Sequence, residues 1–145
     1  MSGEYSELLK RRSLDMAEAA RNLLREGKYD LAVLLAEYSA QLYLKQLLYR
    51  LTGEEWRGHS VRALLGVLAT VLREEGLEGL AVEVESYASR HRRILAELEE
   101  AHVRSVYGPF PYSREQASAL VEAAGSLVAL LRRVESHAFE EPDKA

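Results

Sequence analysis

The densest group of side chains with ligand-binding chemistry lies in the segment HVRSVYGPFPY, from His102 to Tyr112. The guanidinium of Arg104 could hold a phosphate, while the phenol rings of Tyr107 and Tyr112 could stack on a base. Alternatively, the aromatic rings, with Phe110, plug the end of a helical bundle and Arg104 forms an ion pair one turn earlier in its helix. Packing is the favoured interpretation, and this loop is the first choice if the chain has a binding site.

Three other basic features could contact phosphates. Lys45 lies on a polar line of an apolar helix, where it could reach a phosphate in a groove between subunits, although snorkelling to solvent is favoured. His59 precedes Ser60, the expected N-cap of a helix, so we expect it to pack over the helix start. The run RHRR at residues 90–93 would spread around the axis of a continuous helix, which predicts a solvent-exposed face.

No metal site or cofactor is predicted. Glu99 and His102 have the Glu-x-x-His spacing of di-iron bundles, but such sites need a second copy of the motif and two further inward glutamates. The chain contains no cysteine, which excludes thiolate metal sites, a cysteine nucleophile and disulfides. A phosphate-cradling glycine loop and a nucleophile elbow are also absent from the sequence.

The composition of the chain limits the classes of protein to which it can belong. A chain of 145 residues, 48% hydrophobic and 29% charged, fits one globular domain. The net charge of −4 argues against a protein that coats nucleic acid by bulk electrostatics. No apolar run is long enough to span a bilayer and the N-terminus lacks a signal-peptide pattern, so we expect a cytoplasmic protein. An excess of arginine over lysine and a single asparagine suggest a thermophilic source.

Glycine and proline divide the chain into five predicted helices, at about 5–25, 30–51, 60–76, 78–103 and 113–139. No stretch alternates as a strand would, so we predict an all-α fold. Asp30 is expected to cap the second helix, and Ser60 and Ser113 the third and the last. We expect one domain over residues 1–140 and a frayed tail at 141–145.

The second predicted helix has two apolar sectors on a helical wheel. Val33, Ala36, Ala40, Leu44, Leu47 and Leu51 form one, and Leu31, Leu35, Tyr38, Leu42 and Tyr49 form the other. Between them runs a polar line of Glu37, Gln41 and Lys45. A surface helix needs only one apolar sector, so we predict a homodimer through Leu35, Tyr38, Leu42 and Tyr49. The alternative is that the short third helix covers this sector within one chain.

The order and spacing of several motifs resemble the HEPN family of small helical domains. The resemblance is carried by Gly27, Tyr29, Asp30 and Ala32, by Leu44 and Lys45, by His59, Ser60, Arg62, Leu64 and Leu65, and by Arg104, Tyr107 and Pro109. The chain departs from the family pattern at Tyr38, Gln41 and Leu42, where relatives usually carry a glutamine and a Glu-Lys pair. The resemblance implies an antiparallel, up-and-down bundle of four to five helices that is usually dimeric.

The resemblance also implies a function. Relatives often act as partners of a minimal nucleotidyltransferase in toxin–antitoxin-like pairs, and we predict a non-catalytic adaptor that binds a nucleotide or RNA through Arg104, Tyr107 and Lys45. The alternative is a metal-independent ribonuclease toxin, because some branches use an arginine followed four to six residues later by a histidine. The formal match is Arg132 and His137. These two point about 140° apart on a helix, which favours a solvated basic C-terminal turn instead.

Overall fold

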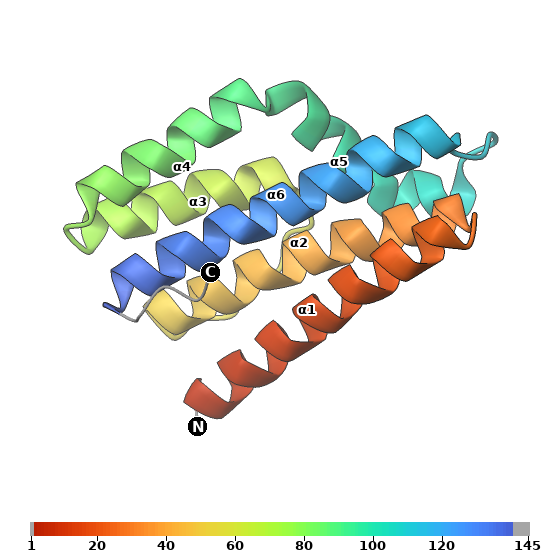
Figure 1. Cartoon of the computed structure of the whole chain (residues 1–145). Helices are drawn as coiled ribbons and strands as arrows, with labels where there is room; N and C mark the ends of the chain where they lie inside the picture. The colour runs from red at the N-terminus through yellow and green to blue at the C-terminus, as the bar shows by residue number, and fades with distance from the viewer. Residues whose placement is uncertain (1, 141–145) are drawn as a thin grey trace.

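The computed structural model describes residues 2–140, and within that range the chain forms helices and no strand (Figure 1). The helices are α1 (Ser2–Arg25), α2 (Tyr29–Thr52), α3 (Val61–Glu74), α4 (Glu78–Arg90), α5 (Arg92–Tyr107) and α6 (Arg114–Ala138). The predicted all-α class is therefore confirmed. The predicted frayed tail, 141–145, lies outside the described residues. None of the helices in this range is long and apolar enough to cross a bilayer.

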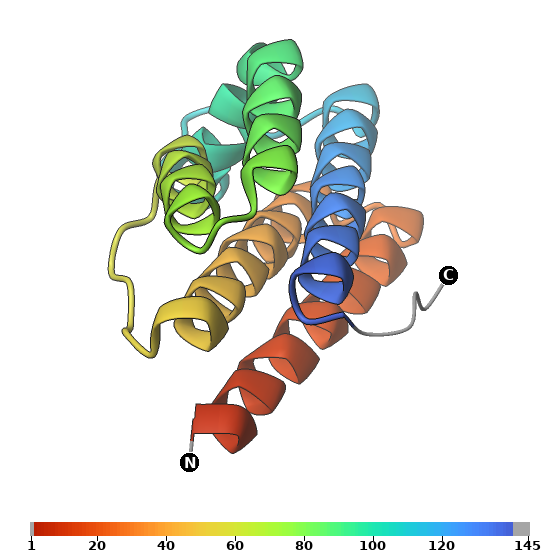
Figure 2. The ribbon, with the colours of Figure 1, turned by 90° about the vertical axis from the view of Figure 1, so that its left-hand side faces the viewer.

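Helix α2 runs through the middle of the bundle. It packs against α1, α3, α5 and α6, and Figure 2 shows it between α1, α3 and α6. Its first apolar sector is buried by these neighbours, apart from the half-buried Leu51. The second sector is only partly covered, since Leu31 and Tyr38 remain 45% and 39% exposed and Leu35 is half-buried.

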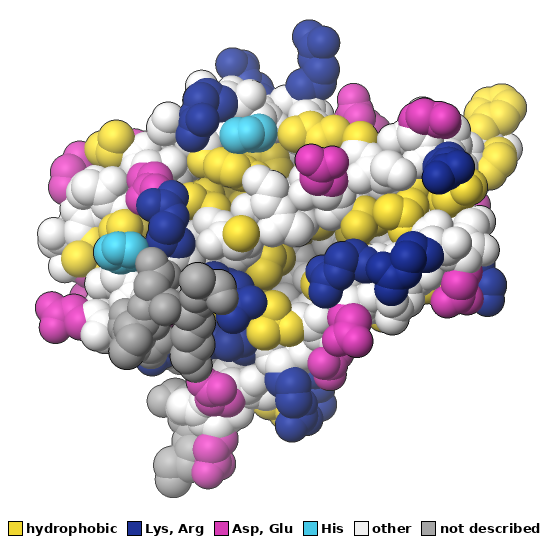
Figure 3. Space-filling model, in the orientation of Figure 1, with side chains coloured by type: hydrophobic (Ala, Val, Ile, Leu, Met, Phe, Trp, Pro, Cys, Tyr) yellow, Lys and Arg dark blue, Asp and Glu magenta, His cyan; other side chains and the backbone are white. Residues whose placement is uncertain are grey.

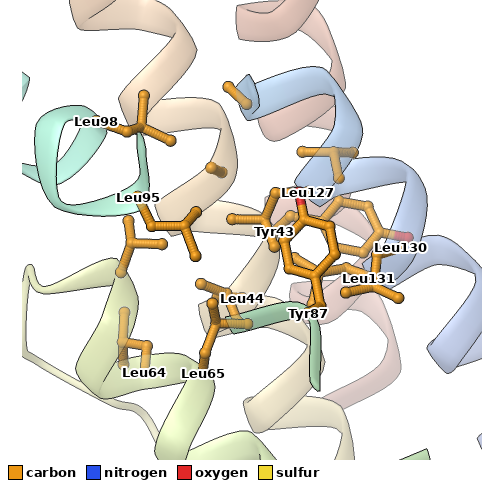
Figure 4. Packing of buried hydrophobic residues seen from close by; sticks show 14 of the residues in the cluster. Tyr43, Leu44, Leu64, Leu65, Tyr87, Leu95, Leu98, Leu127, Leu130 and Leu131 are labelled. Carbon is orange, nitrogen blue, oxygen red and sulfur yellow. The ribbon is translucent and has the colours of Figure 1, made fainter. Parts of the chain in front are cut away.

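The core is built mainly from leucines contributed by four helices. Figure 4 shows Leu44 of α2, Leu65 of α3, Leu95 of α5 and Leu131 of α6 meeting in one cluster, all of them 0–1% exposed. Burying each such side chain contributes about 1.5–3 kcal/mol. This shared core fixes how α5 and α6 lie against α2.

The predicted helix at 78–103 is wrong in one respect, because the chain breaks at His91 into α4 and α5. His91 has φ −112° and ψ 20°, its Nδ1 lies 2.9 Å from the carbonyl oxygen of Tyr87, and its ring stacks on Tyr87 with centroids 4.1 Å apart. Helix α4 packs on α3, whereas α5 also reaches α2. The break thus lets α5 bury Leu95 and Leu98 in the central core.

Two of the three predicted helix starts are confirmed by their hydrogen bonds. The Ser60 hydroxyl accepts from the Ala63 amide, and Ser113 forms a capping box with Gln116. The expectation for Asp30 was wrong. It lies inside the first turn of α2, and its Oδ1 accepts a 2.8 Å hydrogen bond from the backbone amide of residue 112, which ties the start of α2 to the segment before α6.

A buried carboxylate joins three helices at the other side of α2. Glu135 of α6 is 2% exposed and accepts hydrogen bonds from Tyr43 (2.6 Å), Gln46 (3.3 Å) and Arg50 (2.9 Å) of α2, and it lies 3.0 Å from Lys10 of α1. Burial raises the pKa of Glu135, but these donors outweigh it and hold the pKa below its usual value. Glu135 is therefore a charged anchor between α1, α2 and α6.

Candidate functional site

The polar line of α2 is not a solvated face. Glu37 is 0% exposed and Gln41 is 3% exposed, and Lys45 is half-buried. Helix α5 and the segment 53–60 supply the partners of the first two. A buried carboxylate and a buried amide must both be hydrogen-bonded to avoid a large desolvation cost, so their partners show what this line is for.

Two histidines complete the hydrogen bonds of this line. His102 Nδ1 lies 2.9 Å from one oxygen of Glu37, whose other oxygen accepts a 2.8 Å hydrogen bond from the Gln41 amide. His59 Nδ1 lies 2.9 Å from Gln41 Oε1, and the rings of His59 and His102 stack with centroids 4.8 Å apart and planes 17° apart. Tyr38 closes the far side with an edge contact to His102.

The hydrogen bonds fix where the protons of His59 lie. Because Gln41 Oε1 can only accept, His59 Nδ1 must be the donor, and the Nε2 of a neutral His59 carries a lone pair. An ionised Glu37 likewise accepts from His102 Nδ1. Both imidazoles are therefore anchored to α2 through Nδ1, which leaves Nε2 for other partners.

Burial and neighbouring charge shift the pKa values of this group. Burial raises the pKa of Glu37, and the hydrogen bonds from His102 and Gln41 oppose that rise. Burial lowers the pKa of Lys45, while nearby Glu37 opposes the change. The pKa of His59 is lowered by desolvation and further by the charge of Lys45 and by His102. The site thus holds groups whose protonation depends on one another.

A pocket of about 370 Å³ lies beside this group, between α1, the second half of α2 and the segment 53–60. Lys45, Arg57 and His59 bring basic side chains to it, and Trp56, the one tryptophan of the chain, also lines it. Tyr5, Leu9, Leu42, Tyr49 and Glu55 complete the lining. The volume falls in the range of small-molecule sites, and the mixture of cations and aromatic rings suits an anionic ligand with a flat ring.

The structure separates the residues predicted from the segment 102–112. His102 joins the group on α2, but Arg104 lies two residues later and so points to the other side of α5. Its guanidinium sits 4.5 Å from the ring centre of Tyr112, which is 4% exposed. Tyr107 is 81% exposed, so it does not plug the bundle end, and neither does Phe110 at 74% exposed.

The remaining candidates do not belong to the lining of this pocket. Arg132 and His137 are both exposed, they lie five residues apart on α6, and His137 Nδ1 is 2.8 Å from the carbonyl oxygen of Arg133. Glu99 accepts from Ser60 and Arg62, away from the partner of His102. Within residues 2–140, no group of three or more His, Cys, Asp or Glu side chains is placed to hold a metal.

The run at residues 90–93 lies at the corner between α4 and α5, where Arg90, Arg92 and Arg93 are exposed as predicted. Figure 3 shows Lys and Arg side chains around a histidine at the upper edge of the molecule, over the end of α4. None of these three arginines lines the pocket.

Sequence reasoning missed Glu37, Gln41, His59, Trp56 and Arg57 as members of one site. A usable signal was present, because a polar line at i, i+4 and i+8 inside an otherwise apolar helix needs buried partners once that helix is central. His59 was expected only to cover the start of α3, whereas it bonds Gln41 and lines the pocket.

Comparison with known proteins adds the family. The model of the HEPN domain matches residues 6–134, which is nearly the whole chain. The chain belongs to the HEPN family. HEPN domains are helical domains of a nucleotide-binding and ribonuclease type. No curated protein and no solved structure gives a match.

Proposed function

We propose that this HEPN domain is a non-catalytic nucleotide-binding protein and that the nucleotide occupies the pocket between α1, α2 and the segment 53–60. The observation that carries the proposal is the convergence of Lys45, Arg57 and His59 with Trp56 on a single pocket. The cations suit a phosphate, and the indole ring can stack on a base. The proposal keeps Lys45 of the predicted contacts and adds three residues to it.

Trp56 offers a direct test, since its fluorescence reports on the pocket without a label. Titration with ATP, GTP, CTP and UTP should quench or shift the emission with saturation at micromolar to low-millimolar concentrations. Lys45→Ala should weaken binding about tenfold, equivalent to about 1.4 kcal/mol, because it removes a partly desolvated cation. Arg114→Ala, an exposed residue at the start of α6, is the matched control. Absence of saturable binding for all four nucleotides would overturn the proposal.

The same titration tests the loop predicted first from the sequence. Arg104→Ala and Tyr107→Ala should leave the affinity within about twofold if the ligand lies in the pocket, because neither residue lines it. A larger loss of affinity in these variants than in Lys45→Ala would instead favour the loop with Tyr112 and His102 as the binding site.

We also propose that two copies pair through the second apolar sector of α2, with Leu35 and Tyr38 at the contact; Leu42 and Tyr49, the other two residues predicted there, line the pocket. The support is the partial exposure of this sector and of Val103 and Val106 of the neighbouring α5, which are 59% and 55% exposed. Sedimentation at micromolar concentration should report a dimer, and Tyr38→Glu should convert it to a monomer. A wild-type particle of 16.3 kDa would contradict this.

The partner that we propose is a minimal nucleotidyltransferase, with which the chain would form a toxin–antitoxin-like pair in the cytoplasm. A neighbouring gene for such an enzyme, and co-purification of the two proteins, would support this role. The rival is a ribonuclease that uses Arg132 and His137. Cleavage of single-stranded RNA in the presence of chelator, abolished by His137→Ala, would replace the non-catalytic proposal.

A further inference from the structure

The stacked histidines give the pocket a feature that nucleotide binding alone does not need. His59 belongs to the pocket lining, and His102 stacks on it without lining the pocket. Gln41 holds the first imidazole and Glu37 holds the second, both from inside α2. A single cation could hold a phosphate, so a pair of imidazoles fixed by buried partners points to a further role.

Burial, and then the charges nearby, lower the pKa of His59. Lys45 acts on His59 from α2, and the second imidazole acts on it from α5. Glu37 provides the negative charge on the α2 side, although its burial raises its pKa. Other titratable neighbours are Tyr5 of α1, Tyr38 and Tyr49 of α2, Glu55 and Arg57 of the segment 53–60, and the paired Glu99 and Arg62 beside Ser60.

Resting on the proposed nucleotide function, we propose that the pocket selects a terminal phosphomonoester over a phosphodiester, and that His59, held in its stack with His102, takes up one proton from solvent when the phosphomonoester binds. No covalent bond forms or breaks. The proton is held on His59 Nε2, which donates a hydrogen bond to a phosphate oxygen.

The chemistry of the phosphate explains the selectivity. A phosphomonoester has a second pKa near 6 and is mainly a dianion at neutral pH, whereas a diester carries one charge. A dianion beside Lys45 and Arg57 offsets the positive charge of both at His59, whereas a monoanion offsets about half of it, so the monoester favours an imidazolium at His59 more strongly.

Gln41 and Glu37 act as positioning residues in this scheme. Gln41 Oε1 keeps the proton of His59 on Nδ1, so that Nε2 is the atom left to receive the proton that accompanies the ligand. Glu37 lies on the opposite side of the pair and offsets positive charge that reaches His102. Because Gln41 and Glu37 bond the Nδ1 atoms of the two imidazoles, the Nε2 of His59 is the nitrogen that can take up a proton beside the ligand.

Adenosine 5′-monophosphate and 3′,5′-cyclic adenosine monophosphate form a matched pair of probes, because they share base and ribose and differ in phosphate charge. Calorimetric titration at about pH 7.5, in two buffers with different heats of ionisation, gives both affinity and protons exchanged. We expect about one proton taken up with the monophosphate, little with the cyclic compound, and about tenfold tighter binding of the monophosphate. Its affinity should weaken as the pH rises from 6.5 to 8.

Two variants separate the proton effect from simple loss of a contact. His59→Gln keeps a side chain that can hydrogen-bond but cannot titrate, so proton uptake and the preference for the monophosphate should both fall. His137→Gln, an exposed histidine outside the pocket, is the matched control and should behave as wild type. The pH dependence of the wild-type protein tests the same point without any substitution.

The outcomes distinguish this inference from the function on which it rests. Equal affinity for the two adenine compounds, or proton uptake that persists in His59→Gln, overturns the inference while nucleotide binding stands. A protein that binds neither compound and none of the four triphosphates overturns the proposed function, and the inference falls with it.

Discussion

Two buried glutamates, Glu135 of α6 and Glu37 of α2, have different kinds of partner. Glu135 receives two permanent cations, Lys10 and Arg50, along with a phenol and an amide. Glu37 is buried as deeply, yet its partners are a histidine and an amide. The pKa of Glu135 is held below its usual value, and burial raises that of Glu37.

This difference indicates that Glu135 stabilises the fold, whereas Glu37 belongs to the candidate functional site. A carboxylate fixed by permanent cations keeps its charge over the pH range in which the protein works, so it fastens helices together. A buried carboxylate paired with an imidazole can share or exchange a proton within that range. The second arrangement lies beside the pocket that Lys45, Trp56, Arg57 and His59 line, and that placement makes it a candidate for ligand binding.

Removing the anchor should have the largest effect. Glu135→Ala removes the buried acceptor that Lys10, Arg50 and the Tyr43 hydroxyl share and opens a cavity, so unfolding free energy should fall by about 2–3 kcal/mol. Urea unfolding followed by circular dichroism measures this loss. A decrease in unfolding free energy of less than about 0.5 kcal/mol would show that Glu135 does not anchor the helices more firmly than Glu37 does.

Acidification should act on the two glutamates with opposite sign. The lowered pKa of Glu135 means that its stabilisation is complete above 4.5, the usual pKa of a glutamate, and is lost as the pH falls through the folded-state pKa. The raised pKa of Glu37 means that the folded state binds that proton more tightly, so its contribution improves as the pH falls toward 4.5. Unfolding midpoints measured from about pH 7 to pH 3 in Glu135→Gln and Glu37→Gln should each lack one of these components.

Removing one of the two cations should cost less than removing the carboxylate. Lys10→Met keeps the apolar stem of the side chain and leaves Arg50 on Glu135, so we expect a loss of about 1 kcal/mol. Lys28→Met is the control, because Lys28 is exposed and pairs with the exposed Glu26. Equal losses in the two variants would show that the anchor does not depend on charge.

The smallest change in stability is expected at Glu37. Glu37→Gln keeps the shape of the side chain and removes a buried charge with no permanent cation partner, so unfolding free energy should stay within about 0.5 kcal/mol of wild type. The same variant should alter proton uptake on binding of the monophosphate. A loss of stability as large as that of Glu135→Ala would instead make Glu37 a second anchor.

The sequence predicts most of the fold because its signals are local. Gly27, Gly53 and Gly76 adopt positive φ at 79°, 77° and 80° and end helices near where the glycines predicted. The break at His91 was missed because no glycine or proline accompanies it. Tertiary packing of α5, rather than a local preference, places the break there.

The site was harder to predict because its contacts are not local. Lys45 and His102 were both chosen as ligand contacts, but His102 was grouped with Arg104, which points to the other side of the same helix. Spacing along one helix shows which side chains share a face, and it does not show which distant segment covers that face. The bonds from His59 to Gln41 and from His102 to Glu37 span 18 and 65 residues.

The break in the helix at His91 determines where the last turns of α5 lie. Helix α4, with 13 residues, is almost as long as α3, with 14, so a straight continuation of α4 would run past the start of α3. The bend at His91 instead brings the imidazole of His102 over a carboxylate buried in α2. His102 and Glu37 therefore meet because of a corner in the chain path, and straightening that corner would separate them while leaving every helix intact.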